Sequence, residues 1–212
     1  MFFLNFFKIF LKYLFSRKKR YLNLFLLILK TKPKSILEIG VYRGIRSEEM
    51  ISVAKIFNKK IYYYGFDLFE LISKEIKKKE LSKYPINKLE IKKKLLKLTK
   101  FVTLIKGYTK NTLKKFKKTN IKVDFIFIDG GHHINTIKID WFYSLMLSKK
   151  KTIFIFDDYY IDNKLLIKNY GCNKLISSLD KKKFKIKILP FTDYYYLNKI
   201  KTGIKMVQVE KY

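Results

Sequence analysis

Several residue types that commonly shape folds and sites are scarce in this chain. Its 212 residues include one cysteine, three prolines, eight glycines and one tryptophan. The single thiol, Cys172, cannot form an internal disulfide, and no cluster of cysteine and histidine has the spacing of a zinc site. Nothing therefore points to an oxidising compartment, and we expect the chain to reside in the cytoplasm.

Acidic residues and arginines are also rare. The chain has 17 Asp and Glu against 48 Lys and Arg, which gives a formal charge of +31, and only four of the cations are arginines. Clustered cations attract phosphates, but proteins that read bases usually use arginine forks, whereas the lysines here are spread over every segment. The charge therefore favours solvated lysine faces over a nucleic-acid site.

The apolar content of 48% is enough for a full core in one domain. We assign residues 33–212 to that domain and residues 1–32 to an apolar and basic helical segment. Residues 1–15 are almost wholly apolar and residues 17–20 are all basic, but the run is shorter than the roughly 20 residues that span a bilayer.

Two interpretations of this first segment stay open. Residues 1–30 could form a helix in the membrane interface, with the basic group on anionic lipid at the inner membrane face. Alternatively, they form a helical cap that packs on the domain or on a second copy of the chain, as in a homo-oligomer. The pattern slightly favours the cap.

From residue 35 onward, β-branched or aromatic runs alternate with helical patterns, which indicates βαβ units and a parallel sheet. The predicted strands are residues 35–41, 61–67, 101–106, 123–129, 152–157, 184–189 and 204–209, and residues 193–202 are predicted to connect the last two. The predicted helices are residues 47–57, a helix from about Asn87, and residues 111–117, 134–147 and 173–179.

Polar residues follow these strands at their carboxyl ends, where open α/β sheets bind ligands. The first strand ends in a turn with Gly40 and Gly44, which let a ligand approach the backbone before a helix N-terminus. The second strand ends in Asp67, which is placed to bind both hydroxyls of a ribose.

The fourth strand ends in Asp129 and the fifth in Asp157 and Asp158. If these strands are neighbours, the three carboxylates converge and repel one another unless a cation or substrate offsets their charge. Three oxygen ligands with open water positions suit Mg²⁺, so the sequence predicts a magnesium site here.

These motifs resemble those of class I S-adenosylmethionine-dependent methyltransferases. Residues 38–44 resemble the first cofactor motif, in the variant that has Tyr42 where many members carry a glycine. Residues 123–133 and 157–159 resemble a bacterial group that includes macrocin O-methyltransferase and is similar to catechol O-methyltransferase-like, metal-dependent enzymes. The resemblance implies an α/β, Rossmann-like methyltransferase fold, with a mostly parallel seven-stranded sheet, helices on both faces and an antiparallel last strand.

The resemblance also implies roles for individual residues. The implied cofactor contacts are Glu38, Gly40, Tyr42, Gly44, Asp67, Tyr108 and Asp129. Among them, Glu38 helps to hold the amino group of the methionine part through the turn. Tyr108 stands where an acidic residue commonly contacts the adenine.

The catalytic assignments follow in the same way. Asp129, Asp157 and Asp158 match the metal ligands of the magnesium-dependent members. His132 stands three residues past the first ligand, where the catechol enzymes place a basic residue, and histidine can accept a proton near neutral pH. His133 is the second candidate, and either histidine can instead cap the helix that begins near residue 134.

Together these features predict an enzyme that uses S-adenosylmethionine and Mg²⁺ to methylate a hydroxyl of a small molecule, such as a sugar or natural product. A nucleic-acid methyltransferase is an alternative, but the fourth strand ends in Asp-Gly-Gly-His instead of the Asn/Asp-Pro-Pro-aromatic turn of base amino-group methylases. An NAD-dependent oxidoreductase would need the full G-x-G-x-x-G fingerprint. A membrane-associated, catalytically silent methyltransferase-fold protein is the remaining alternative.

Overall fold

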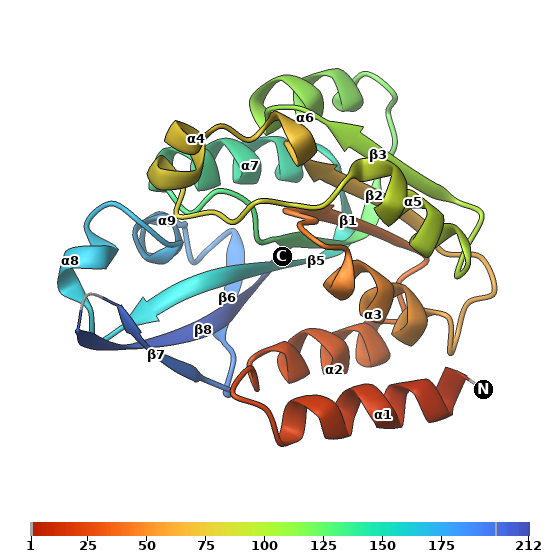
Figure 1. Ribbon diagram of the computed structural model, residues 1–212, viewed down its shortest axis with the longest axis horizontal. Helices are drawn as coiled ribbons and strands as arrows, with labels where there is room; N and C mark the ends of the chain where they lie inside the picture. The colour runs from red at the N-terminus through yellow and green to blue at the C-terminus, as the bar shows by residue number, and fades with distance from the viewer. Residues whose placement is uncertain (1, 198) are drawn as a thin grey trace.

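The computed structural model describes residues 2–197 and 199–212, and over these residues the chain forms one central sheet with helices on both faces (Figure 1). The sheet of this part of the chain has eight strands in the order β3-β2-β1-β4-β5-β8-β6, and β7 also pairs with β8. Strands β1 to β5 run parallel, whereas β8 is antiparallel to β5, β6 and β7. The strands are β1 (Ser35–Ile39), β2 (Tyr62–Asp67), β3 (Val102–Lys106), β4 (Val123–Ile128), β5 (Ser148–Ile161), β6 (Phe184–Ile188), β7 (Asp193–Leu197) and β8 (Ile200–Lys211).

The helices divide between the two faces of the sheet. Helices α1, α2, α3 and α5 pack on one face, and α6, α7 and α9 pack on the other. The helical elements are α1 (Phe2–Leu14), α2 (Tyr21–Thr31), α3 (Ile45–Ala54), η1 (Phe69–Leu71), α4 (Lys74–Lys79), α5 (Lys88–Leu96), α6 (Thr109–Lys117), α7 (Ile134–Met146), α8 (Lys164–Ile167) and α9 (Asn173–Ser178).

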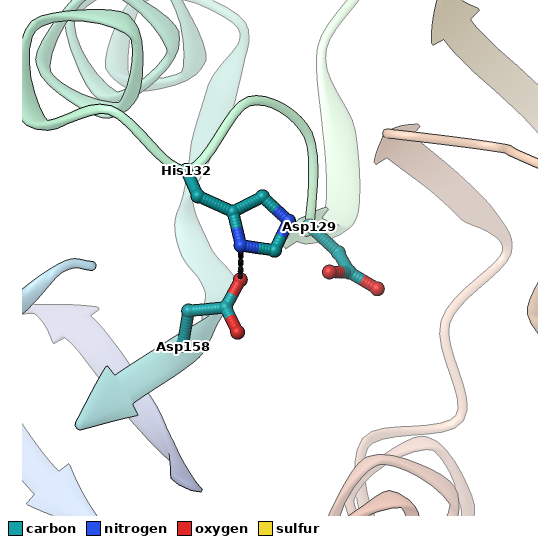
Figure 2. A group of neighbouring side chains, drawn as sticks. All are labelled: Asp129, His132 and Asp158. Atoms are coloured by element: carbon teal, nitrogen blue, oxygen red, sulfur yellow. Dashed lines mark ion pairs between the residues drawn. The ribbon is translucent and has the colours of Figure 1, made fainter. Parts of the chain in front are cut away.

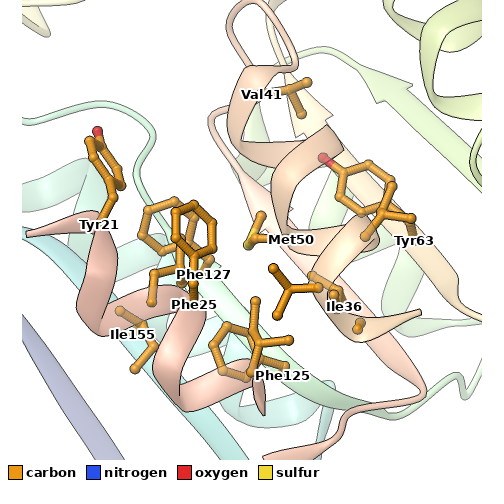
Figure 3. Packing of buried hydrophobic residues seen from close by; sticks show 14 of the residues in the cluster. Tyr21, Phe25, Ile36, Val41, Met50, Tyr63, Phe125, Phe127 and Ile155 are labelled. Carbon is orange, nitrogen blue, oxygen red and sulfur yellow. The ribbon is translucent and has the colours of Figure 1, made fainter. Parts of the chain in front are cut away.

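The near-continuous apolar run of residues 123–128 forms β4, the middle strand of the sheet, which is covered by helices on both faces. Side chains alternate across a strand, so Phe125 and Phe127 enter the core beneath α2 and α3 (Figure 3). Ile126 and Ile128 enter the core on the opposite face, beneath α7. All four are buried. A strand covered on both faces therefore fixes the middle of the sheet, and its end point fixes the position of Asp129.

The predicted α/β fold, with a mostly parallel sheet and antiparallel C-terminal strands, is confirmed. Element bounds shift by a few residues and the short helices α4 and α8 were not predicted, but two differences change the sheet. Residues 193–197, which were predicted to lie in a connection, form the extra strand β7, and β5 continues to Ile161 instead of ending at residue 157. Both differences have one cause, because the N-terminal half of β8 is long enough to pair with β7 on one side and the end of β5 on the other.

The first segment of the chain packs on the domain. Leu24, Phe25 and Ile28 of α2 are buried in the same cluster as Phe125 and Phe127 of the sheet. Helix α1 lies further out and contacts α2 and α3. Among the described residues, no helix combines the length and the apolar character needed to cross a membrane.

Candidate active site

A cavity of about 330 Å³ lies at the carboxyl ends of β1, β2, β4 and β5. This volume is within the range of small-molecule sites. Seven of the predicted site residues line it: Gly40, Tyr42, Asp67, Tyr108, Asp129, His132 and Asp158. Four others do not: Glu38, Gly44, His133 and Asp157.

The turn after β1 brings the ends of β1 and β4 together. Gly40 has a φ of +95°, and a Cβ at this position would lie 1.9 Å from the carbonyl oxygen of Asp129. Only glycine permits so close an approach. Gly44 has a φ of +73° and precedes α3, so the turn delivers the N-terminus of a ten-residue helix to the cavity.

Asp67 at the end of β2 is held rigidly. Its Oδ2 accepts the backbone N–H of Tyr42 at 2.7 Å, and its Oδ1 accepts that of Phe69 at 3.0 Å. The adjacent loop is fixed as well, because the N–H of Gly107 donates to the carbonyl of Asp67. Tyr108 follows this loop, is 53% exposed and lines the same cavity as Asp67.

Asp129, His132 and Asp158 form a cluster of polar side chains at the cavity (Figure 2). One possible ligand atom from each lies within 4.8 Å of the others. The Nδ1 of His132 lies 3.0 Å from Oδ2 of Asp158 and 3.2 Å from the hydroxyl of Tyr160, and the other ring nitrogen lies on the side of Asp129 (Figure 2). Asp158 therefore fixes the orientation of the imidazole ring.

Burial and mutual repulsion perturb these carboxyls. Burial, followed by the charges of Asp157 and Asp158, raises the pKa of Asp129 well above its usual range. Burial also raises the pKa of Asp158, although His132 opposes that shift. Carboxyls with such pKa values favour a cation or a shared proton between them.

Asp157 was predicted to join this cluster as a metal ligand, and the structure places it elsewhere. Its two oxygens accept from Nε and Nη2 of Arg20 at 2.7 and 2.8 Å, and its side chain is fully buried. Alternation along β5 explains the separation, because neighbouring residues point to opposite faces. Asp158 also has a φ of +56° at a register shift between β5 and β8, which turns its side chain to the cavity.

Arg20 therefore acts as a cation supplied by the chain itself. Its Nη1 pairs with Asp193, and its backbone N–H donates to the same carboxylate at 2.9 Å. Although burial alone would raise the pKa of Asp157, the Arg20 guanidinium holds it below its usual range. His132 consequently occupies the place in the cluster that had been predicted for Asp157.

Glu38 and His133 have structural positions behind the cavity. Glu38 is fully buried and accepts hydrogen bonds from the hydroxyls of Ser47 and Tyr63, so it ties β1 to α3 and β2. Burial raises its pKa to about 8. His133 caps α7, since its Nδ1 accepts the N–H of Asn135 at 3.3 Å.

Three acidic or basic residues near the cavity were not anticipated. Glu80 holds the loop after β4, because it accepts the N–H of His133 at 3.1 Å and the hydroxyl of Thr136 at 2.9 Å. Nothing in its lysine-rich surroundings distinguishes it in the sequence. A sequence signal for Asp140 did exist, because it is a charged residue on the apolar face of α7. Burial raises its pKa to about 7. Arg20 is the third.

Residues 37–159, more than half of the chain, match the family described as a methyltransferase domain. The chain belongs to this methyltransferase domain family. The matched region of the methyltransferase contains the turn after β1, Asp67, Asp129, His132 and Asp158. No curated protein sequence matches the chain.

Solved structures share the Rossmann-like methyltransferase fold. The O-methyltransferase TomG from Streptomyces achromogenes, involved in tomaymycin synthesis and in complex with SAM, is 12% identical, with a TM-score of 0.59 over 88% of this chain and 78% of that one. The O-methyltransferase from Bacillus cereus in complex with SAH is 18% identical, with a TM-score of 0.58 over 88% and 79%. A proposed rRNA methylase from Clostridium thermocellum is 17% identical, with a TM-score of 0.62 over 91% and 97%. At these identities the likeness concerns the fold alone.

Proposed function

We propose that this methyltransferase transfers the methyl group of S-adenosylmethionine to a hydroxyl of a small molecule, such as a sugar or a natural product. One observation carries the proposal: Asp67 of β2, Asp129 and His132 of the loop after β4, and Asp158 of β5 line a single cavity. Membership of the methyltransferase domain family and the fold shared with O-methyltransferases in complex with SAM or SAH support it.

The donor would bind along the ends of β1 and β2. Asp67 would accept the ribose hydroxyls, because each of its fixed oxygens retains a lone pair after accepting one backbone N–H. Tyr108 would contact the adenine through its exposed ring. Gly40 and Tyr42 would leave room for the methionine part of the donor. Glu38 would help to hold the amino group of that part indirectly, by anchoring the turn after β1. The sulfonium is a cation, so the carboxylates of the cavity also favour it electrostatically.

The transfer itself requires an oxygen nucleophile in line with the methyl group. The acceptor oxygen forms a bond to the methyl carbon while the carbon–sulfur bond breaks, and the donor leaves as S-adenosylhomocysteine. His132 accepts the hydroxyl proton on the ring nitrogen that does not face Asp158. Asp158 stabilises the imidazolium that results.

The donor set also suits a divalent cation. Asp129 and Asp158 offer carboxylate oxygens within reach of one another, and a site with two carboxylates and water fits Mg²⁺. When bound, the ion would lower the pKa of the acceptor hydroxyl. His132 would then serve as the base and Asp157 would stay with Arg20, so the ligand set proposed here is smaller than the sequence predicted.

Calorimetric titration with S-adenosylmethionine tests the proposal. We expect the wild-type chain to bind it and Asp67→Asn to bind at least tenfold more weakly, because the amide loses one acceptor toward the ribose. Asp180→Asn is the matched control, since Asp180 lies on the surface outside the cavity, and it should bind like the wild type. Absence of heat with the wild-type chain would reject the proposal.

A further inference from the structure

Helix α1 carries an apolar ridge on its outer face. Leu4, Phe7, Leu11 and Phe15, which we call the α1 ridge, are 64%, 58%, 37% and 83% exposed. Their spacing of three or four residues places Leu4, Phe7 and Leu11 along one side of the helix, and Phe15 directly follows its last residue. The other side packs inward, because Tyr13 is buried and contacts Glu49 of α3. Figure 1 shows α1 at the outer edge of the molecule, with α2 beside it on the side of the sheet.

The sequence that carries the α1 ridge is basic, and the one carboxylate that pairs with α1, Glu49 of α3, lies on its inner side, where it is bound by Lys12, Tyr13 and Arg46. The first acidic residue of the chain is Glu38, and residues 1–37 contain nine lysines and arginines. Lys8 is exposed beside the ridge, and Arg17, Lys18 and Lys19 are exposed in the turn that follows α1. No ion pair of the described residues involves these four cations.

An exposed apolar ridge flanked by exposed, unpaired cations fits one kind of partner. A second copy of the chain would bring a like charge of +31 against the same face, so repulsion opposes self-association there. A nucleic acid would satisfy the cations but leave the ridge in water. An anionic lipid bilayer satisfies both, because its acyl boundary takes the apolar side chains and its head groups take the basic ones.

We propose that α1 docks this protein on anionic membranes. The helix lies in the plane of the interface with the α1 ridge among the lipids, and Lys8 and the basic turn contact head-group phosphates. Its 13 residues lie flat on the bilayer and do not span it. Lys18 of the basic turn also lines the cavity, so docking brings the cavity close to the head-group layer. The docking does not depend on the proposed methyl transfer.

Vesicle co-sedimentation of the full chain tests this proposal. The vesicles are pure phosphatidylcholine, or phosphatidylcholine with about a third phosphatidylglycerol. The test variant combines Leu4→Gln, Phe7→Gln and Phe15→Gln. The matched control combines Leu89→Gln, Phe142→Gln and Leu165→Gln, whose side chains are similarly exposed, at 65%, 52% and 76%, but lie elsewhere. Titration with S-adenosylmethionine reports the binding function of each protein separately.

We expect the wild type and the control to bind the anionic vesicles, and the ridge variant to bind at least tenfold more weakly. All three should give the same result with S-adenosylmethionine, so a failed methyltransferase assignment would leave the vesicle result intact. Equal binding of the ridge variant would overturn the proposal, because charge alone would then account for adsorption. Equal binding to pure phosphatidylcholine, or a wild-type dimer that the ridge variant abolishes in the absence of lipid binding, would also overturn it.

Discussion

At the scale of single residues, Asp157 and Asp158 show that neighbouring residues of one type can have different roles. The two carboxylates are adjacent in sequence, yet Asp157 neutralises Arg20 in the core and Asp158 orients His132 at the cavity. The sequence identified both as acidic residues near the end of a strand. It could not show that one would pair with Arg20 and the other with His132, because Arg20 lies 137 residues from Asp157 along the chain.

The Arg20 pairing predicts a stability effect. We expect Asp157→Asn to lower the free energy of unfolding by about 3 kcal/mol, because it leaves a buried guanidinium with only Asp193 as its acidic partner. Urea unfolding measures this, with Asp180→Asn as a surface control that should change it by less than about 0.5 kcal/mol. A loss below about 1 kcal/mol for Asp157→Asn would show that the pair is not a structural element.

Glu38 predicts a dependence of stability on pH. Its pKa is about 8 in the folded chain and near its ordinary value when unfolded, so only the unfolded state releases the proton between these values. The contribution of Glu38 to the free energy of unfolding is therefore complete at low pH. It declines as the pH rises toward 8, by at most about 1.4 kcal/mol per pH unit.

Glu38→Gln should remove this slope, since glutamine resembles the protonated form. Urea unfolding of both proteins at pH 5, 6, 7 and 8 makes the comparison. The wild type should lose stability relative to the variant with each step. Identical slopes would mean that Glu38 ionises freely in the folded chain.

At the scale of elements, the contact between the β1 turn and the end of β4 holds the cavity together. An added Cβ would meet backbone at Gly40 but only the flexible side chain of Ile91 at Gly44, and both positions have positive φ. We expect Gly44→Ala to cost about 1–3 kcal/mol in strain and Gly40→Ala to cost clearly more, because the ends of β1 and β4 must also separate.

Thermal or urea unfolding ranks the two substitutions, with each alanine serving as the control for the other. Gly40→Ala should also weaken S-adenosylmethionine binding more than Gly44→Ala does. Equal costs would indicate that the two strand ends can move apart without penalty, contrary to the arrangement described here.

The elements also show what local pattern can predict. Strands β1, β2 and β4 were predictable because their apolar runs are covered on both faces and end in recognisable turns. Strand β7 was not, because its Tyr-rich run becomes a strand only through pairing with the extended part of β8. The packing of residues 1–30 on the domain was one of two interpretations that the pattern left open, because it depends on contacts of α2 with β4 and β5.

At the scale of the whole molecule, lysines and arginines are distributed differently. Lysines cover the surface, whereas three of the four arginines, Arg20, Arg43 and Arg46, line the cavity. Arg20 directly precedes α2, Arg43 lies in the turn after β1, and Arg46 lies in α3, and Arg20 and Arg46 are paired with carboxylates behind the cavity wall. Composition alone suggested dispersed charge, and folding concentrates the arginines.

A crystal structure of the chain with S-adenosylhomocysteine tests the central claim most directly. We predict that the ligand occupies the cavity between the ends of β1 and β4, with its ribose hydroxyls within hydrogen-bond distance of Asp67 and its sulfur facing the cluster of Asp129, His132 and Asp158. A ligand bound elsewhere, or a ribose remote from Asp67, would contradict the account.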